Sequence, residues 1–182
     1  PLRPTYFEAL VVAACELFRR ARVEIGVVEV GIGGRLDATN VLEPEVSVVT
    51  NVAADHLETL GPTLSDVARE KAGIFRPRRP ALTAASGEAL RVLGEEADRI
   101  GAFLEIVSPS SAWDDVSPLA GAHQRGNLAL GVAAARLFAP LDEETVRRGI
   151  AAIRWPGRLQ TVPRAGLRPL LVDGAHNPAG AA

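Results

Sequence analysis

Several residue types are scarce in this chain, and each scarcity excludes a class of protein. A single cysteine, Cys15, among 182 residues excludes an internal disulfide and a cluster of thiolate metal ligands, and it favours a reducing cytoplasm. Aromatic residues make up only 4%, which argues against a surface that stacks nucleic-acid bases. No apolar run reaches the roughly 18 residues that a membrane-spanning helix needs. We therefore expect a cytoplasmic protein with no membrane partner.

An excess of one charge is also lacking. The 20 basic and 22 acidic side chains leave a formal charge of -2 at pH 7, so we predict no nucleic-acid partner. Methionine is absent, and the chain stops soon after a helix start predicted at residues 177–178. We therefore expect an internal piece of a longer protein, with room for one well-buried domain and part of another.

The sequence does contain an alternation of helix and strand patterns. Helical spacing of apolar residues predicts helices at residues 5–21, 63–73, 87–101, 122–138 and 142–153. Runs of aliphatic residues predict strands at residues 23–30, 46–52, 80–84, 103–107, 159–162 and 170–172. The stretch W-P-G-R at 155–158 ends the helical pattern and predicts a linker. The alternation predicts an α/β fold with a mainly parallel sheet flanked by helices.

A glycine-rich stretch, E-V-G-I-G-G-R-L-D-A-T-N at 29–40, follows the first predicted strand. It lacks the G-x-G-x-x-G spacing of a dinucleotide loop, and no Gly-Lys pair of a Walker A loop occurs in the chain. A metal or anion site is still open, because Glu29 and His56 would each follow the carboxyl end of a predicted strand, with Asp55 beside them. Equally, the glycines could serve only a tight turn, with Glu29 solvated.

Seven stretches, in order along nearly the whole chain, resemble the folylpolyglutamate synthase/dihydrofolate synthase family, a branch of the Mur ligase superfamily. The stretches are T-Y-F-E (5–8), E-V-G-I-G-G-R-L-D-A-T-N (29–40), D-H (55–56), A-R-E-K-A-G-I (68–74), H-Q-R-G-N (123–127), W-P-G-R-L (155–159) and D-G-A-H-N-P (173–178). The resemblance implies a monomeric, ATP-dependent amide ligase. In such an enzyme a carboxylate of dihydropteroate or a reduced folate is phosphorylated, and the amine of L-glutamate then attacks the acyl phosphate.

The resemblance also implies the catalytic centre. Glu29 and His56 match Mg²⁺ ligands; because Mg²⁺ prefers oxygen, only the resemblance supports the histidine. Lys71 matches a catalytic lysine that the family carbamylates, which turns an ammonium into an anion. The alternative is that Lys71 has no catalytic role and is an ordinary solvated helix lysine paired with Glu70. Mg²⁺ and the cosubstrate ATP are the implied cofactors.

Two further groups of residues match ligand contacts of the family. Those on the pterin side are Thr5, Tyr6, Phe7, Glu8, Leu36, Asp37 and Ala38. Those on the ATP side are Asn127, Arg158 and Asp173, with His176 and Asn177 in the same motif as Asp173. For Thr5 and Glu8 a helix capping box is a complete structural alternative. For Asp37 we expect an exposed carboxylate that bonds a pterin ring nitrogen.

The domain organisation also follows from the resemblance. It makes residues 1–156 a Mur-ligase-type central ATP-binding domain, residues 157–165 an interdomain linker and residues 166–182 the start of a second α/β domain. The family's phosphate loop is expected before Pro1 and most of the glutamate-binding domain after Ala182. We therefore expect the 182 residues alone to be inactive.

Two rival functions are open. One is another Mur-type ligase that acts on a cell-wall precursor, which would share the Asp-His pair and the modifiable lysine. T-Y-F-E and G-G-R-L-D-A-T-N favour the folate branch. The other is a non-catalytic nucleotide-binding or scaffold module. The joint presence of Glu29, His56 and Lys71 argues against that module. The sequence does not distinguish dihydrofolate synthase from folylpolyglutamate synthase.

Overall fold

The computed structural model of this chain describes residues 3–175. Its helices are α1 (Tyr6–Ala21), α2 (Leu57–Leu60), α3 (Leu64–Ala72), α4 (Gly87–Ile100), α5 (Gln124–Arg136) and α6 (Glu143–Ala151), with one 3-10 helix, η1 (Ala38–Val41). Its strands are β1 (Ser47–Val49), β2 (Pro80–Thr83), β3 (Phe103–Ile106), β4 (Gln160–Val162) and β5 (Leu170–Val172). All five predicted helices are present. The short helix α2 was not predicted.

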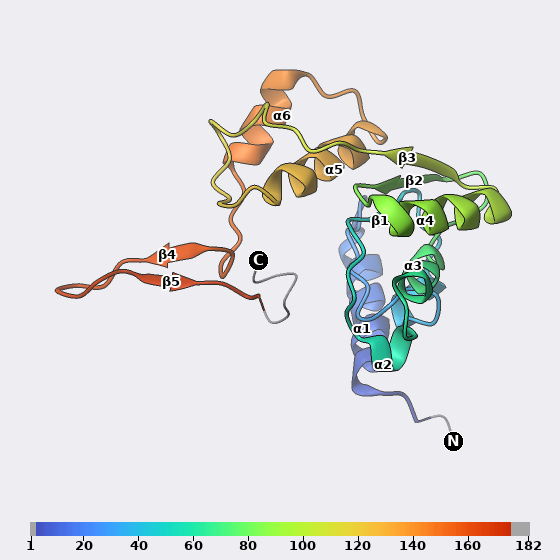
Figure 1. Cartoon of the computed structure of the whole chain (residues 1–182). Coiled ribbons are helices and arrows are strands. Elements are labelled where there is room, and N and C mark those ends of the chain that lie inside the picture. Colours follow the sequence, from blue (N-terminus) through green and yellow to red (C-terminus); the bar gives the residue numbers. More distant parts are fainter. Residues whose placement is uncertain (1–2, 176–182) are drawn as a thin grey trace.

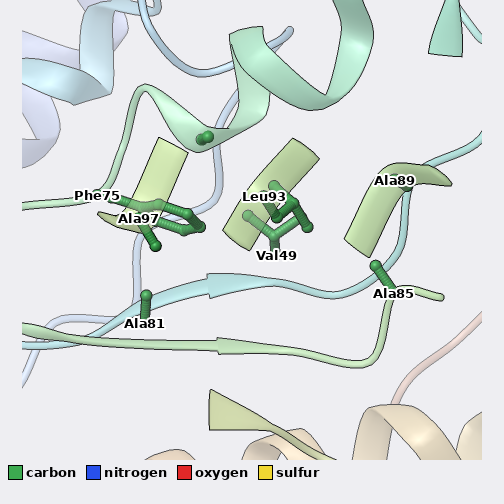
Figure 2. Packing of buried hydrophobic residues seen from close by; sticks show 8 residues of the cluster. Val49, Phe75, Ala81, Ala85, Ala89, Leu93 and Ala97 are labelled. Carbon is green, nitrogen blue, oxygen red and sulfur yellow. The ribbon is translucent and has the colours of Figure 1, made fainter. Parts of the chain in front are cut away.

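The central sheet is parallel, with strand order β1-β2-β3. Val48 pairs with Leu82, and Ala81 pairs with Leu104. Helices α3 and α4 pack together and cover one face, while α5 contacts β2 from the opposite side (Figures 1 and 2). The predicted α/β fold, a parallel sheet flanked by helices, is therefore confirmed.

The main core lies between this sheet and helices α3 and α4 (Figure 2). Leu93 of α4 is fully buried at its centre, together with Val49 of β1 and Phe75 from the turn after α3. The other buried members are all alanines: Ala72, Ala81, Ala85, Ala89 and Ala97. Such small side chains let α4 approach the sheet closely at native packing density.

A second buried cluster joins α5 to α6. Trp113, from the polar stretch before α5, is buried in it, and its Nε1 donates a hydrogen bond to Glu143 Oε1 at 2.6 Å. A buried indole N–H needs such a partner, because an unpaired donor away from water is costly. The irregular segment is therefore anchored to the helices that follow it.

The strand predicted at residues 23–30 is wrong. No described segment pairs with it, and the central sheet begins at β1. Val27 is 94% exposed, so these valines are not packed as a buried strand would be. β-Branched residues favour a pleated, half-buried surface, but a strand also needs a neighbour for its N–H and C=O groups. The sequence pattern shows that the residue types suit a strand, but it does not show whether another segment lies alongside to pair with it.

Beyond α6, the two predicted strands form an antiparallel hairpin. Gln160 pairs with Val172, and Val162 pairs with Leu170. The pairing joins the predicted linker, residues 157–165, to residues 170–172 of the predicted second domain. The helix start predicted at 177–178, with His176 and Asn177, lies outside the described residues. Within residues 3–175, no helix combines the length and apolar character needed to cross a membrane.

Candidate functional site

A cleft of about 290 Å³ lies between the start of α1 and the glycine-rich stretch. Six of the seven residues predicted on the pterin side line it: Thr5, Phe7, Glu8, Leu36, Asp37 and Ala38. Tyr6 is not part of the lining, and the residue is 80% exposed. The lining also contains four residues that were not predicted, Ile32, Thr59, Leu60 and Glu70. Thr59 and Leu60 belong to α2, whose single turn has no periodicity to detect.

Thr5 and Glu8 form the predicted capping box at the start of α1. Glu8 Oε2 accepts from Thr5 N at 2.6 Å and from Thr5 Oγ1 at 2.8 Å, while Glu8 N donates to Thr5 Oγ1 at 3.2 Å. The Thr5 backbone N–H holds the pKa of Glu8 below its usual value. Both residues therefore cap the helix and also line the cleft.

Asp37 organises the glycine-rich stretch from inside. Its Oδ2 accepts from Gly31 N at 3.0 Å and Ile32 N at 3.1 Å, and its Oδ1 accepts from Thr39 N at 2.9 Å and Thr39 Oγ1 at 2.5 Å. Partial burial alone would raise the pKa of Asp37, but these hydrogen bonds outweigh it and the pKa is lowered. The carboxylate is half-buried and engaged, not the exposed group that the sequence suggested.

This arrangement predicts a pH-dependent contribution of Asp37 to stability. Because its folded-state pKa is lowered, the stabilisation is complete above the unfolded value of about 3.9 and is lost as pH falls through the folded value. We expect Asp37→Asn to lower the urea midpoint at pH 7, and the difference from the unmodified chain to shrink below about pH 4. Urea titrations of both proteins at several pH values measure this. A difference that stays constant down to acid pH would contradict it.

The glycines let this stretch pack tightly against α3. Gly33 has φ +71, a left-handed conformation that glycine adopts without strain. A Cβ on Gly34 would lie 2.8 Å from the carbonyl oxygen of Glu70, closer than real contacts allow. Arg35 N donates to that same carbonyl at 2.8 Å, and the Arg35 guanidinium pairs with Glu70 Oε1 at 2.8 Å. The stretch thus forms a wall of the cleft that is fixed to α3.

Lys71 follows Glu70 on α3 and is half-buried. Burial lowers the pKa of Lys71, and the attraction of the nearby Asp55 carboxylate partly opposes this. Glu70, which was suggested as an ion-pair partner of Lys71, is instead paired with Arg35. A lowered pKa increases the fraction of neutral amine, which is the nucleophilic form.

His56 lies beyond the carboxyl end of β1, in a left-handed conformation with φ 53 at the start of α2. Its backbone N donates to Asp55 Oδ1 at 2.9 Å, and its Nε2 lies 3.9 Å from Asp55 Oδ2. Glu29 is exposed beside an apolar groove along α1. Since Glu29 does not end a strand, its pairing with His56 stays a prediction from the resemblance.

The donor set limits what kind of metal site could form here. Within residues 3–175, no three His, Cys, Asp or Glu side chains are grouped so as to hold a metal ion. A structural zinc site, which needs four protein ligands, therefore does not fit this part of the chain. Mg²⁺ fits better, because it commonly takes one or two protein ligands and completes its shell with water and substrate phosphates.

The predicted ATP-side residues lie around the start of α5. Asp173 accepts from Leu159 N and from Ala175 N, each at 2.7 Å, and Gly174 N donates to Gly157 O at 2.8 Å. These N–H groups, chiefly that of Leu159, lower the pKa of Asp173, and the charges of Arg158 and His123 add to the effect. Arg158 and Asp173 are thus brought together beside His123.

Asn127, the third residue predicted on the ATP side, lies in the first turns of α5. It is exposed, and its Nδ2 donates to Gln124 Oε1 at 3.0 Å. The short segment from His123 to Asn127 therefore extends from the Arg158–Asp173 junction along the helix.

The chain is similar to known proteins along nearly its whole length. The Mur ligase middle domain family matches residues 4–97. A dihydrofolate synthase/folylpolyglutamate synthase of Bacillus subtilis is 35% identical over 98% of this chain and 48% of its own length. Its Escherichia coli counterpart is 36% identical over 96% of this chain and 44% of its own length. A probable bifunctional folylpolyglutamate synthase/dihydropteroate synthase of Halobacterium salinarum is 39% identical over 96% of this chain and 24% of its own length.

Solved structures show the same fold. A mutant folylpolyglutamate synthase of L. casei superposes with a TM-score of 0.87 at 32% identity, over 98% of this chain and 50% of that one. E. coli FolC, in complex with DHPP and ADP, superposes with a TM-score of 0.85 at 35% identity, over 98% of this chain and 46% of that one. This chain thus spans about half the length of these enzymes or less. The match to residues 4–97, about half of the chain, shows that it belongs to the Mur ligase middle domain family.

Proposed function

We propose that this chain is the substrate-side part of an ATP-dependent ligase that joins L-glutamate to a carboxylate of dihydropteroate or a reduced folate. The observation that carries the proposal is the cleft, in which residues 5, 7, 8 and 36–38 meet although they are far apart in sequence. Those residues match the pterin-side contacts of the folate branch. The relatives that the chain resembles along nearly its whole length are named folylpolyglutamate and dihydrofolate synthases.

The proposed reaction has two steps. A carboxylate oxygen of the pterin substrate attacks the γ-phosphorus of ATP, so that an acyl phosphate forms and ADP leaves. The amine of L-glutamate then attacks the acyl carbon, inorganic phosphate leaves, and the amine loses a proton. Such a site must neutralise charge on the transferred phosphoryl group and exclude water from the acyl phosphate.

Mg²⁺ would supply positive charge beside the phosphate oxygens in this reaction. Glu29 and His56 would hold it; a relative from Yersinia pestis is described in complex with AMPPNP and a Mn ion. Arg158 would complement a phosphate with its planar donor fork, while Asn127 and Asp173 would contact the nucleotide.

Lys71 would act as its carbamate. The neutral amine attacks the carbon of CO₂ and loses a proton, which replaces an ammonium by an anionic carboxylate on the side chain. The lowered pKa of Lys71 favours the neutral amine that this step requires. The resulting anion could accept a hydrogen bond from water. We also propose that the protein is monomeric and cytoplasmic.

Ligand binding by the 182-residue chain tests the proposed function. Calorimetry is expected to detect binding of dihydropteroate or a tetrahydrofolate to this chain, and no binding of a UDP-linked muramyl peptide. A coupled assay is expected to find no glutamate-dependent ATP turnover by this chain alone. Preferential binding of the muramyl peptide would instead identify a cell-wall ligase. Binding of neither pterin nor peptide, in a folded chain, would favour the non-catalytic module.

A further inference from the structure

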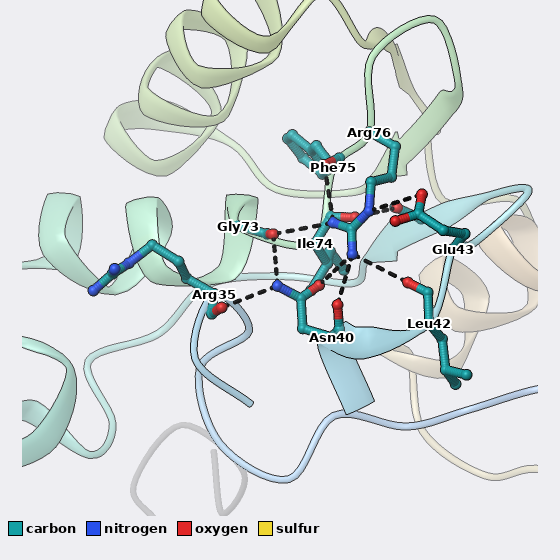
Figure 3. A network of polar contacts seen from close by, with 9 residues as sticks. Arg35, Asn40, Leu42, Glu43, Gly73, Ile74, Phe75 and Arg76 are labelled. Carbon is teal, nitrogen blue, oxygen red and sulfur yellow. Dashed lines mark hydrogen bonds and ion pairs between the residues drawn. The ribbon is translucent and has the colours of Figure 1, made fainter. Parts of the chain in front are cut away.

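Arg76, in the turn after α3, is a nearly buried arginine that mainly contacts backbone carbonyls (Figure 3). Its side chain is 15% exposed. Nη2 donates to Asn40 O at 2.8 Å and Leu42 O at 3.1 Å, and Nη1 donates to Phe75 O at 3.2 Å and Gly73 O at 3.4 Å. A planar guanidinium with fixed donor directions can serve several carbonyls at once, which a lysine ammonium cannot reproduce.

Asn40 completes the connection from the other side. Its Oδ1 accepts from Arg76 Nη2 at 2.9 Å. Its Nδ2 donates to Arg35 O at 3.0 Å and to Gly73 O at 3.1 Å. Asn40 and Arg76 therefore fasten the glycine-rich stretch to the end of α3 (Figure 3). We call these two side chains the Asn40–Arg76 tie.

The tie joins two walls of the cleft. Residues 36–38 of one wall lie between Arg35 and Asn40 in the sequence, and Glu70 of the other wall lies on α3, next to Lys71. Neither Asn40 nor Arg76 is among the residues that line the cleft. Any effect they have on a bound substrate must therefore be transmitted through the backbone that they hold.

We propose that Asn40 and Arg76 are positioning residues for the substrate cleft: they fix residues 36–38 relative to α3 and so determine affinity for the pterin substrate. This inference rests on the proposed function. Loss of the tie leaves the hydrogen bonds of Asp37 and the Arg35–Glu70 contacts intact, but residues 36–38 are then held to α3 on the Arg35 side only. Substrate affinity falls, whereas nucleotide binding, which involves the start of α5, does not change.

Two variants and a matched control test the proposal. Arg76→Gln and Asn40→Ala each remove part of the tie. Arg79→Ala is the control, because Arg79 lies only three residues from Arg76 and forms an exposed ion pair with Glu45. We expect faster hydrogen exchange at the amides of residues 31–42 in both variants, with that of α4 unchanged. We also expect dihydropteroate to bind about tenfold more weakly, the size of effect that loss of hydrogen bonds to a charged group produces.

In the full-length protein that carries this chain, the same variants should raise KM for the pterin substrate while kcat and KM for ATP stay the same. Arg76→Lys should not restore affinity, because it lacks the planar fork. If the unmodified chain binds dihydropteroate and both tie variants bind it equally well, the inference is overturned although the proposed function stands. If the unmodified chain binds no pterin, the proposed function itself fails. Exchange that rises equally in α4 and residues 31–42 would show a general folding role and overturn the inference.

Discussion

Gly73→Ala is expected to destabilise the chain by roughly 3 kcal/mol, near the upper part of the usual range for overpacking a close contact. Gly73 ends α3 with φ -60, so its conformation suits any residue, and only the space is lacking. A Cβ there would overlap the Cα and Cβ of Arg35 and lie 2.8 Å from Arg35 N. Because backbone atoms cannot rotate away as a flexible side chain can, the glycine-rich stretch must separate from α3. Urea unfolding followed by circular dichroism measures the change.

Gly94→Ala is the matched control for this substitution. Gly94 lies within α4, and a Cβ there meets no atom within 4 Å. Alanine is the better helix former, so this change is expected to stabilise the chain by roughly 0.5 to 1 kcal/mol. Opposite signs for the two variants would confirm that Gly73 is needed for close approach. If Gly73→Ala were as stable as the unmodified chain, the packing of Arg35 against α3 would be refuted.

Glu29→Ala with His56→Ala is expected to lower ligase turnover of the full-length protein by a factor on the order of 10³ or more, the loss seen when a charge that stabilises phosphoryl transfer is removed. The two side chains lie in different loops, and we propose that one Mg²⁺ joins them to the ATP phosphates. Removing both ligands should therefore affect turnover far more than folding. A coupled assay for ADP release with dihydropteroate and L-glutamate measures the loss, and circular dichroism checks the fold.

Glu58→Ala provides the control for the metal ligands, since Glu58 is an exposed acid on α2 close to His56. It should leave turnover within twofold of the unmodified enzyme, about 0.4 kcal/mol. Chelation of divalent cations should stop turnover by the unmodified enzyme and by Glu58→Ala, and added Mg²⁺ should restore both. If the Glu29→Ala/His56→Ala enzyme folds and its turnover is unchanged, the proposed metal site is wrong.

The helices could be predicted from the sequence because their signals are local. Thr5 with Glu8, and Thr63 with Asp66, form capping boxes at three-residue spacing, and the structure contains both. Apolar periodicity then gives the helix length and the buried face. The strands predicted at 80–84 and 103–107 form at 80–83 and 103–106, because the chain also supplies the strands that pair with them.

The parts that could not be predicted depend on contacts between distant residues. The pattern at 23–30 favours a strand, but pairing is decided by whether another segment lies alongside. The Asn40–Arg76 tie joins side chains 36 positions apart, and nothing in the sequence around either residue predicts that they are in contact. Asp37 was expected to face a ligand, whereas its carboxylate accepts hydrogen bonds from the stretch around it. The resemblance implied that the pterin-side residues lie together, but their spacing in the sequence did not indicate it.

The capping box at Thr5 and Glu8 has a consequence for how this protein would respond to its ligand. Glu8, whose carboxylate stabilises the first turn of α1, also lines the cleft, so a ligand bound in the cleft would be linked thermodynamically to formation of that turn. A molecule that leaves the Thr5–Glu8 hydrogen bonds intact would protect that turn from fraying. One that competes for the Glu8 oxygens would lose roughly 1 kcal/mol of affinity to the broken cap. The N-terminus of α1 would thus discriminate among ligands by the hydrogen bonds that they leave undisturbed.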